Sequence, residues 1–256
     1  MTKADLAADL EAARRGRYAI TSRRGTRNAV SLLDAYELGR DLELERVSAG
    51  WRPAGWKLGF TNQALWNRLG LDSPIRARIY DETLCRGDLD IADLVQPRIE
   101  PEIVVGIGAN VPQMSEPDVI ADAVEWVAAG LEVVHCHFER WEMTPAEAVA
   151  DAGVHAALAI GPRSQVDADV VPGLGAATCQ LLLDGVLTAT GTGADVLGGP
   201  LDALHWLLKG LPDGLRAGEI VTTGTLTQAM PLQRGQRWEH RLSAPIALEP
   251  VQLRIR

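Results

Sequence analysis

Glu100 and Glu102 are separated by one residue in the segment RIEPEIVVGIG, whose other side chains are mostly apolar. Successive side chains of a β-strand point to opposite faces, so both carboxylates lie on one face and Ile99 and Ile103 lie on the other. Two carboxylates on one face repel each other and are costly to remove from water. A hard divalent cation between them would relieve both problems.

A third carboxylate, Glu132, lies inside the apolar run AAGLEVVHCHF, where an uncompensated charge is hard to explain. Three carboxylates, with water and substrate oxygens completing the coordination shell, are a common way to hold Mg²⁺. The pattern also allows another interpretation. Glu100 and Glu102 would then lie on a solvated edge strand, or would pair with Arg98 and Arg140.

The composition supports a folded enzyme and excludes some partners. The chain has 256 residues, of which 46% are hydrophobic and 23% are charged, so it is long and apolar enough to bury a sizeable core. Its formal net charge of -9 argues against a surface that neutralises phosphates or sits on anionic lipid. We therefore expect neither nucleic acid nor a membrane as a partner.

The cysteines indicate a reducing compartment. Cys85, Cys136 and Cys179 lie far apart without a C-x-x-C pair, so neither a disulfide framework nor a cysteine zinc site is expected. The N-terminal segment MTKADLAADLEAARRGR lacks the apolar stretch of a secretory signal, and no later run approaches the roughly 20 apolar residues of a membrane span. We expect a cytoplasmic protein.

The hydrophobic pattern changes after residue 50. Before it, apolar residues recur at three- to four-residue spacing, which predicts helices, and TSRRGTRNA between them is typical of a polar loop. After it, short apolar runs broken by glycine and proline predict strands, as in PAGWKLGF, RIYDETL, RIEPEIVVGIG and GLEVVHCHF. We predict an α+β fold, with a small helical N-terminal region at 1–50 packed on a larger, mostly β domain at 51–256.

Three further elements are predicted within the larger domain. A helix is expected near Ser115, with Pro117 in its first turn and an apolar stripe made by Val119, Ile120, Val124 and Val127. A second helix is expected from Pro200. The Asp-Gly pair in QLLLDGVLTATG, flanked by apolar runs, predicts a β-hairpin. The segment from EIVTTGTLT to the end is strand-like again.

Five segments in this order resemble one enzyme group: GWKLGFTNQALWNRLGLDSPI, RIEPEIVVGIG, GLEVVHCHFERW, GADVLGGPLDALHWLLKGL and LRAGEIVTTGTLTQAM. The chain is similar to the 2-keto-4-pentenoate hydratases and 4-oxalocrotonate decarboxylases of the fumarylacetoacetate hydrolase superfamily. The resemblance implies a mixed β-roll domain of the C-terminal type of that superfamily. It also implies a metal held by Glu100, Glu102 and Glu132, and an active-site lysine at Lys57. Taken alone, a lysine in the run GWKLGF is expected to extend its ammonium from a surface strand.

The chemistry that the resemblance implies is a lyase reaction on 2-oxo or 2-hydroxy dienoates, of the type found in the meta-cleavage catabolism of aromatic compounds. The C1 carboxylate and C2 oxygen of such a substrate can chelate Mg²⁺, or Mn²⁺ as an alternative, which stabilises negative charge at the C2 oxygen. Lys57 would bind a carboxylate or move protons. Thr223 and Thr225 would hold the substrate's carboxylate, although an ordinary loop pair of threonines explains them equally well.

The chain departs from the family pattern at several positions. Ile75 in DSPI stands where hydratases commonly carry an acidic residue, and together with Pro101 it favours decarboxylation. His135 and His137 stand where the family has Asp and Arg, and His155 closes ADAGVH where the family has ADNASS.

These histidines leave alternatives open. A histidine titrates near neutrality, so His135, His137 and His155 suit a C–C bond hydrolase or tautomerase of an acylpyruvate-like substrate. Equally, His135 and His155 would face each other in the core and only replace lost hydrogen bonds. A third possibility is a silent partner subunit of an active homologue.

We expect a small-molecule 2-oxo acid as substrate and a homo-oligomer, with a complex containing a related hydratase or decarboxylase as an option. Trp126, Trp141 and Trp238 would serve subunit interfaces or fill the core.

Overall fold

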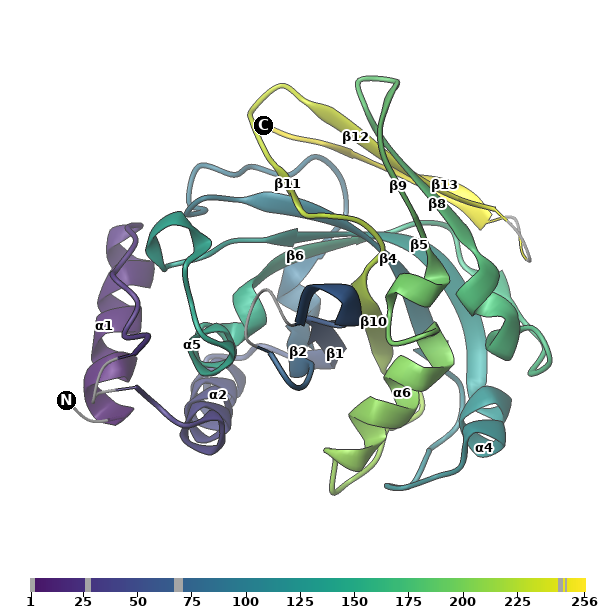
Figure 1. The fold of residues 1–256 in the computed structure, drawn as a ribbon, viewed down its shortest axis with the longest axis horizontal. Helices are drawn as coiled ribbons and strands as arrows, with labels where there is room; N and C mark the ends of the chain where they lie inside the picture. Colours follow the sequence, from purple (N-terminus) through teal and green to yellow (C-terminus); the bar gives the residue numbers. More distant parts are fainter. Residues whose placement is uncertain (1–2, 26–28, 67–70, 244–245, 247) are drawn as a thin grey trace.

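The structure is a computed structural model that describes residues 3–25, 29–66, 71–243, 246 and 248–256. Two N-terminal helices confirm the helical prediction for the first fifty residues: α1 (Lys3–Gly16) and α2 (Leu32–Ser48) (Figure 1). The Ser31 side chain caps α2 by accepting a hydrogen bond from the backbone N–H of Asp34. Within the predicted loop TSRRGTRNA, residues 26–28 lie outside the described residues.

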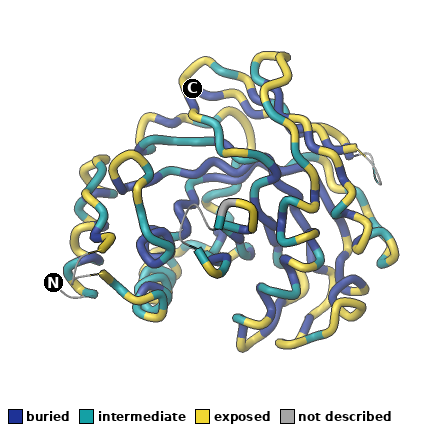
Figure 2. Tube along the Cα trace, in the orientation of Figure 1, coloured by how far each residue is buried: buried dark blue, intermediate teal, exposed yellow. Residues whose placement is uncertain are grey.

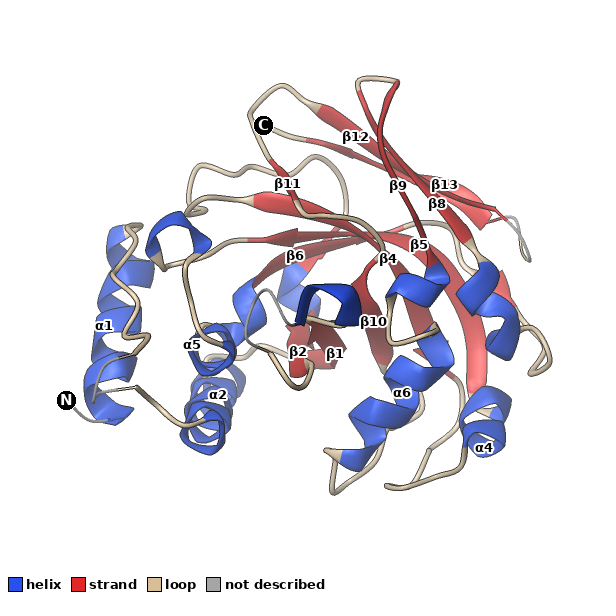
Figure 3. Cartoon of the chain, in the orientation of Figure 1, coloured by secondary structure: helices blue, strands red, loops and turns tan. Residues whose placement is uncertain are grey.

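A large mixed sheet forms the centre of the molecule, in the strand order β2-β1-β10-β4-β5-β6-β3, with β11 added on β4 and β7 on β5. Its strands are β1 (Pro53–Gly59), β2 (Ile75–Tyr80), β3 (Leu84–Cys85), β4 (Arg98–Ile107), β5 (Val124–Val134), β6 (His155–Ile160), β7 (Ser164–Gln165), β10 (Ile220–Thr225) and β11 (Met230–Pro231). The pairs β1–β10 and β3–β6 are parallel, and the remaining pairs are antiparallel. The sheet curls into a half-barrel, as Figure 3 shows, which confirms the predicted α+β class.

A smaller sheet packs on the outside of β5 in the order β13-β12-β8-β9. It consists of β8 (Thr178–Leu183), β9 (Val186–Thr192), β12 (Arg237–Ser243) and β13 (Leu248–Arg254). The predicted hairpin is β8–β9, and its turn residues Asp184 and Gly185 both have positive φ, 49° and 83°. Such a turn matches the twist of the flanking strands, and Asp-Gly is a favoured pair for it.

Three shorter α-helices lie in the described part of the chain: α4 (Pro117–Asp122), α5 (Pro145–Ala150) and α6 (Pro200–Lys209). Helix α6 begins at Pro200 as predicted and contacts α4 and β10, while α5 contacts α2. Figure 2 shows the strands of the large sheet as the most continuously buried part of the chain. None of the described helices is long and apolar enough to cross a membrane.

The predicted helix near Ser115 is shorter than expected. Helix α4 ends at Asp122, and Val124 and Val127 belong to strand β5. Val119, which was expected on the buried stripe, is 48% exposed. A spacing of three residues fits a helix, but a register shift in the β4–β5 pairing between Val124 and Trp126 lets both valines join the same core cluster from a strand.

The N-terminal helices share a core with the large domain. Leu6, Leu10 and Ala35 are fully buried in one cluster with Val134 and Phe138 of the sheet region. The boundary at residue 50 therefore stays a prediction.

The tryptophans give one correction. Trp238 is 1% exposed and Trp126 is 5% exposed, so both fill the core and neither is free for a subunit interface. Trp141 is partly buried, and its indole N–H donates to the carbonyl of Gln96.

Candidate active site

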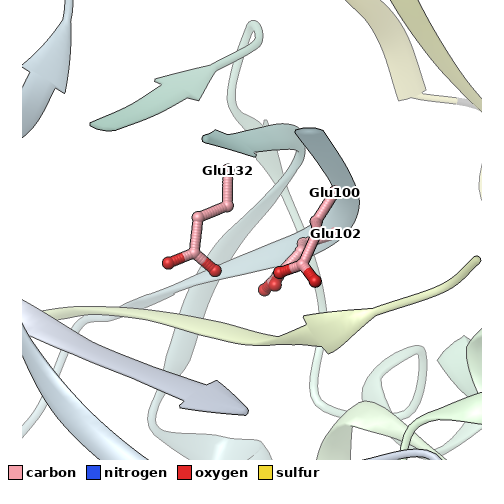
Figure 4. Close-up of side chains that lie close together, drawn as sticks. All are labelled: Glu100, Glu102 and Glu132. Carbon is pink, nitrogen blue, oxygen red and sulfur yellow. The ribbon is translucent and has the colours of Figure 1, made fainter. Parts of the chain in front are cut away.

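The three predicted glutamates converge on one face of the large sheet (Figure 4). Glu100 and Glu102 lie on β4, and Glu132 lies directly opposite Glu100 on β5. One oxygen from each carboxylate lies within 4.8 Å of the others. Glu102 and Glu132 are completely buried, and Glu100 is partly buried. This is the geometry of a three-carboxylate metal site.

The alternative interpretation of Glu100 and Glu102 is wrong. Strand β4 lies between β10 and β5, so these glutamates are not on a solvated edge. Arg98 stacks on the Trp141 ring, and Arg140 pairs with Glu142 on the surface. The positive charge that faces the cluster comes from elsewhere.

Lys57 supplies that charge from β1. Its ammonium is 2% exposed, lies 3.3 Å from Glu132 Oε2 and donates to the carbonyl of Gly153 at 3.1 Å. Burial lowers the pKa of Lys57, but the charges of Glu132, Glu100 and Glu102 outweigh burial and raise it overall. The structure therefore does not support the expectation that this lysine reaches out from a surface strand.

The glycine at position 153 makes room for this contact. A Cβ on Gly153 would lie 3.1 Å from Lys57 Cδ and only 2.6 Å from the Ala77 side chain, and φ is 65°. An L-residue with a side chain is strained at such a φ as well as crowded. The family's ADNASS pattern gives no hint of this role for Gly153.

The metal-free cluster resists carrying three negative charges. Burial raises the pKa of Glu102 well above its usual range, and the nearby charge of Glu132 raises it further. Burial likewise raises the pKa of Glu100 to about 7, against the opposing effect of Lys57. Burial also acts upward on Glu132, but Lys57 and His155 outweigh it and lower its pKa. Glu132 is thus the ionised member of the set.

The residues present fit a divalent cation. Glu102 Oε2 accepts a hydrogen bond from the Gly224 backbone N–H at 2.9 Å, while Glu102 Oε1 is buried and has no hydrogen-bond partner among the described residues. Glu132 Oε2 also has no hydrogen-bond partner among the described residues and lies 3.3 Å from the Lys57 ammonium. Two buried, unsatisfied carboxylate oxygens facing a common point are what a hard cation with oxygen ligands requires.

His155 supports the cluster from behind. Its Nδ1 lies 2.8 Å from Glu132 Oε1 and its Nε2 lies 2.8 Å from the Thr83 hydroxyl. His155 therefore does not hydrogen-bond to His135, because both nitrogens of its ring contact other residues. A histidine that holds a ligand carboxylate fixes the orientation of that carboxylate.

His137 and His135 form a second buried group next to the site. His137 Nδ1 lies 2.9 Å and 3.0 Å from the two oxygens of Asp151, which Arg14 of helix α1 also contacts at 3.2 Å. The His135 ring stands edge-on to His137 with centroids 4.6 Å apart, and its Nδ1 is buried without a partner. Burial lowers the pKa of His135 to about 4, so its ring is neutral at physiological pH.

The three predicted substrate-binding residues all contact other parts of the protein. The Thr223 hydroxyl is buried and donates to the carbonyl of Ile103, and the Thr225 hydroxyl donates to the carbonyl of Thr227. Ile75 is 1% exposed and packs in the core cluster that also holds Val134. These contacts leave the two hydroxyls engaged with the backbone.

Two other hydroxyls were missed by the sequence reasoning. Thr222 lies beside Lys57 in the parallel β1–β10 pair, and its hydroxyl is buried without a partner among the described residues. The Thr61 hydroxyl is also buried and unpartnered, next to Gly224. Strand alternation was the available signal, because it places Thr222 and Thr223 on opposite faces of β10.

Fold and site together define an α+β protein in which three converging carboxylates, arranged as a divalent cation requires, face a buried lysine. The family profile described as "Fumarylacetoacetate (FAA) hydrolase C-terminal" matches residues 81–248, and the chain belongs to this family.

Relatives and solved structures are consistent with this family assignment. A 4-oxalocrotonate decarboxylase from a Pseudomonas species is 29% identical over 213 residues, covering 81% of this chain and 82% of that protein. A 2-keto-4-pentenoate hydratase from Burkholderia vietnamiensis is 32% identical over 190 residues, covering 71% of each. The structure of 4-oxalocrotonate decarboxylase from Pseudomonas putida, complexed with magnesium and adipate, superposes with a TM-score of 0.89 at 24% identity, covering 98% of this chain and 96% of that one.

Proposed function

We propose that this chain is a Mg²⁺-dependent lyase that acts on 2-oxo or 2-hydroxy dienoates, by decarboxylation or by hydration. The observation that carries the proposal is the buried Lys57 ammonium 3.3 Å from Glu132, one of three converging carboxylates. Relatives at about 30% identity are named as a decarboxylase and as hydratases of such compounds. Mn²⁺ would satisfy the same oxygen ligands.

In this proposal Glu100, Glu102 and Glu132 would hold the metal, which would supply Lewis-acid stabilisation of negative charge on a substrate oxygen. His155 keeps Glu132 in position through its 2.8 Å contact. Gly224 does the same for Glu102 through its backbone N–H.

Lys57 donates to the carbonyl of Gly153 and lies 3.3 Å from the carboxylate of Glu132, so its nitrogen is surrounded by oxygens and carries a proton. A protonated lysine binds the substrate's carboxylate or delivers a proton to its carbon chain, and it does not start as a base. The unpartnered hydroxyl of Thr222, beside Lys57, is a further donor for a substrate oxygen.

We favour decarboxylation of a 4-oxalocrotonate-like substrate. A 2-oxohex-3-enedioate would isomerise its double bond and lose its distal carboxylate as CO₂, leaving 2-hydroxypenta-2,4-dienoate after proton uptake. Hydration would instead take that dienoate and add water at C4. The support is Ile75, an apolar core residue where hydratases commonly carry an acid, and Pro101 between two of the ligands.

We also propose that the protein is cytoplasmic and homo-oligomeric. The support for the first is the cysteine usage, since Cys85, Cys136 and Cys179 are all free thiols. The support for the second is helix α2, which exposes Leu33 and Leu44 at 72% and 61%. A complex with a related hydratase or decarboxylase would use the same apolar surface.

The test is an ultraviolet and mass-spectrometric assay of the purified protein with Mg²⁺. The protein is offered 2-oxohex-3-enedioate, 2-hydroxypenta-2,4-dienoate and an acylpyruvate in parallel. Release of CO₂ from the first or addition of water to the second supports a lyase and distinguishes its two forms. Turnover of the acylpyruvate alone contradicts the proposal. Failure of the purified protein to bind Mg²⁺ would favour a silent subunit instead.

A second candidate, hydrolysis of an acylpyruvate-like substrate, is favoured by one observation. His135 is neutral and presents a buried, unpartnered Nδ1 beside the His137–Asp151 pair, as a general base requires. His135→Ala separates the candidates, with His205→Ala on α6 as a matched control. The lyase proposal expects an altered substrate preference, and the hydrolase candidate expects loss of all turnover.

A further inference from the structure

A cavity of about 1070 Å³ lies away from the glutamate cluster, between helix α2, the strands β1 and β2, and the loop at 210–220. Neither Lys57 nor any of the three glutamates lines it. Trp56, the neighbour of Lys57, lines this cavity, and adjacent residues of a strand point to opposite faces. The cavity is therefore separate from the proposed metal centre.

Arg76 lines this cavity, and its guanidinium is held in place without an ion pair. The guanidinium stacks on the Tyr36 ring at 4.5 Å. Its other side is accommodated by Gly210, where an added Cβ would lie 2.5 Å from a guanidinium nitrogen. Tyr36 also accepts a hydrogen bond from the Arg76 side chain, and no carboxylate of the described residues forms an ion pair with Arg76. Burial lowers the pKa of Arg76, which reflects the cost of holding this charge without a counter-ion.

Arg46 repeats the arrangement from helix α2. Its guanidinium lies 4.9 Å from the Trp51 ring and 5.0 Å from the Tyr80 ring, and no described carboxylate forms an ion pair with it. Burial lowers the pKa of Arg46 as well. Two partly buried arginines thus share a cavity wall, each oriented by aromatic rings.

Arg78, in the same wall, shows what a neutralised arginine looks like here. It stacks on Trp56 at 3.7 Å and forms ion pairs with Glu43 at 2.8 Å and Glu219 at 2.9 Å. The chain has a net charge of -9, so carboxylates are plentiful, yet none of the described ones neutralises Arg46 or Arg76. The cavity wall thus keeps two arginines without an ion pair in a protein with an excess of acids.

We propose that this cavity is a binding site for a small organic anion that carries carboxylate or phosphate groups, with Arg76 and Arg46 as its anchors. Guanidinium groups bind both kinds of oxyanion through paired N–H donors, and stacking on a ring orients those donors in advance. The volume suits a small molecule. This site is independent of the proposed lyase activity.

The test titrates metal-free protein with citrate and, separately, with pyrophosphate, at constant ionic strength. Binding is followed by calorimetry and by the melting temperature. Metal-free protein is used because both probes chelate Mg²⁺. The variants are Arg76→Gln, Arg46→Gln and the charge-preserving Arg76→Lys, with Arg234→Gln as the control, since Arg234 is exposed and pairs with Asp90.

We expect saturable binding of at least one probe, and the tighter probe identifies the carboxylate or the phosphate class. Loss of one charge-assisted anchor should weaken binding about tenfold or more in Arg76→Gln and Arg46→Gln. Arg76→Lys should retain part of it, and Arg234→Gln should bind like the wild type. Equal losses in all variants would overturn the proposal, because they would reveal nonspecific charge attraction. No saturable binding of either probe would also overturn it, as would a changed oligomeric mass in Arg76→Gln, which would mean that another subunit fills the cavity.

Discussion

The affinity of the protein for Mg²⁺ should rise with pH across neutrality, because the metal competes with protons for Glu100 and Glu102. Burial raises the pKa of Glu100 to about 7 and that of Glu102 well above its usual range in the metal-free protein. The cation binds the carboxylate form. Each of these groups that is protonated must therefore release its proton when the metal enters.

The size of the effect follows from Glu100 alone. A group with a pKa of about 7 is roughly one-eleventh ionised at pH 6 and ten-elevenths ionised at pH 8, so the apparent affinity should increase about tenfold between these values. Glu102 adds to this, which makes tenfold a lower bound. At pH 6 each bound Mg²⁺ should displace about one to two protons.

The measurement is isothermal titration calorimetry at three pH values, repeated in buffers with different ionisation enthalpies to count the protons. Glu100→Gln should bind Mg²⁺ more weakly and release about one proton fewer. Glu125→Gln, an exposed change on the neighbouring strand β5, should behave like the wild type. An affinity that does not change between pH 6 and pH 8 would refute the reasoning, because the cluster would then be fully ionised before the metal binds.

Metal affinity is a cleaner observable here than metal-free stability. The raised pKa of Glu100 stabilises the fold below pH 4.5, and this contribution is lost as the pH rises through about 7. Burial lowers the pKa of His135 and of His240 to about 4. The stability that these two neutral rings contribute is therefore lost as the pH falls from about 6.5 to about 4. The two trends overlap in one pH window, and a melting curve would report only their difference.

Three further changes test the site and the fold. Glu102→Gln should abolish the Mg²⁺-dependent rise in melting temperature, while Glu125→Gln should keep it. For the wild type, Mg²⁺ at a hundredfold excess over Kd should stabilise the fold by about 2.7 kcal/mol, which raises the melting temperature by roughly 5–10 °C. Lys57→Met should lower turnover about 10²- to 10⁴-fold in a steady-state assay, with Mg²⁺ binding unchanged or tighter because a neighbouring cation is removed. Gly55→Ala should cost about 2 kcal/mol or more in urea denaturation, because its Cβ would lie 1.9 Å from a backbone oxygen of β10, whereas Gly87→Ala, with nothing within 4 Å, should be neutral.

Local sequence patterns predicted what depends on neighbours in the chain. The period of two placed Glu100 and Glu102 on one face, with Ile99 and Ile103 fully buried on the other, as observed. The Asp-Gly turn and the Pro200 helix start are equally local signals. Each needs only a few consecutive residues, so one sequence suffices to find it.

Contacts that depend on strand register were beyond that reasoning. Glu132 meets Glu100 only because β5 pairs with β4 in one register, and a slip by one residue would turn Glu132 to the other face. His155 reaches Glu132 for the same kind of reason, through the β5–β6 pairing and its bulge. Local reasoning also left the tryptophans between an interface and the core, because the burial of Trp238 depends on packing between the two sheets.

The charge balance of the site explains why local reasoning predicted an exposed Lys57, whereas the structure buries it. Beside Trp56 and Leu58 alone, a lysine is better placed in water, but Lys57 is buried against three carboxylates from other strands. One ammonium among three carboxylates leaves a formal charge of minus two in a buried space. Without a metal, the cluster relieves this charge by binding protons, which is why the pKa values of Glu100 and Glu102 are raised. A divalent cation brings the formal charge to zero with Lys57 still protonated. The lysine can therefore stay charged for the substrate while the metal is bound.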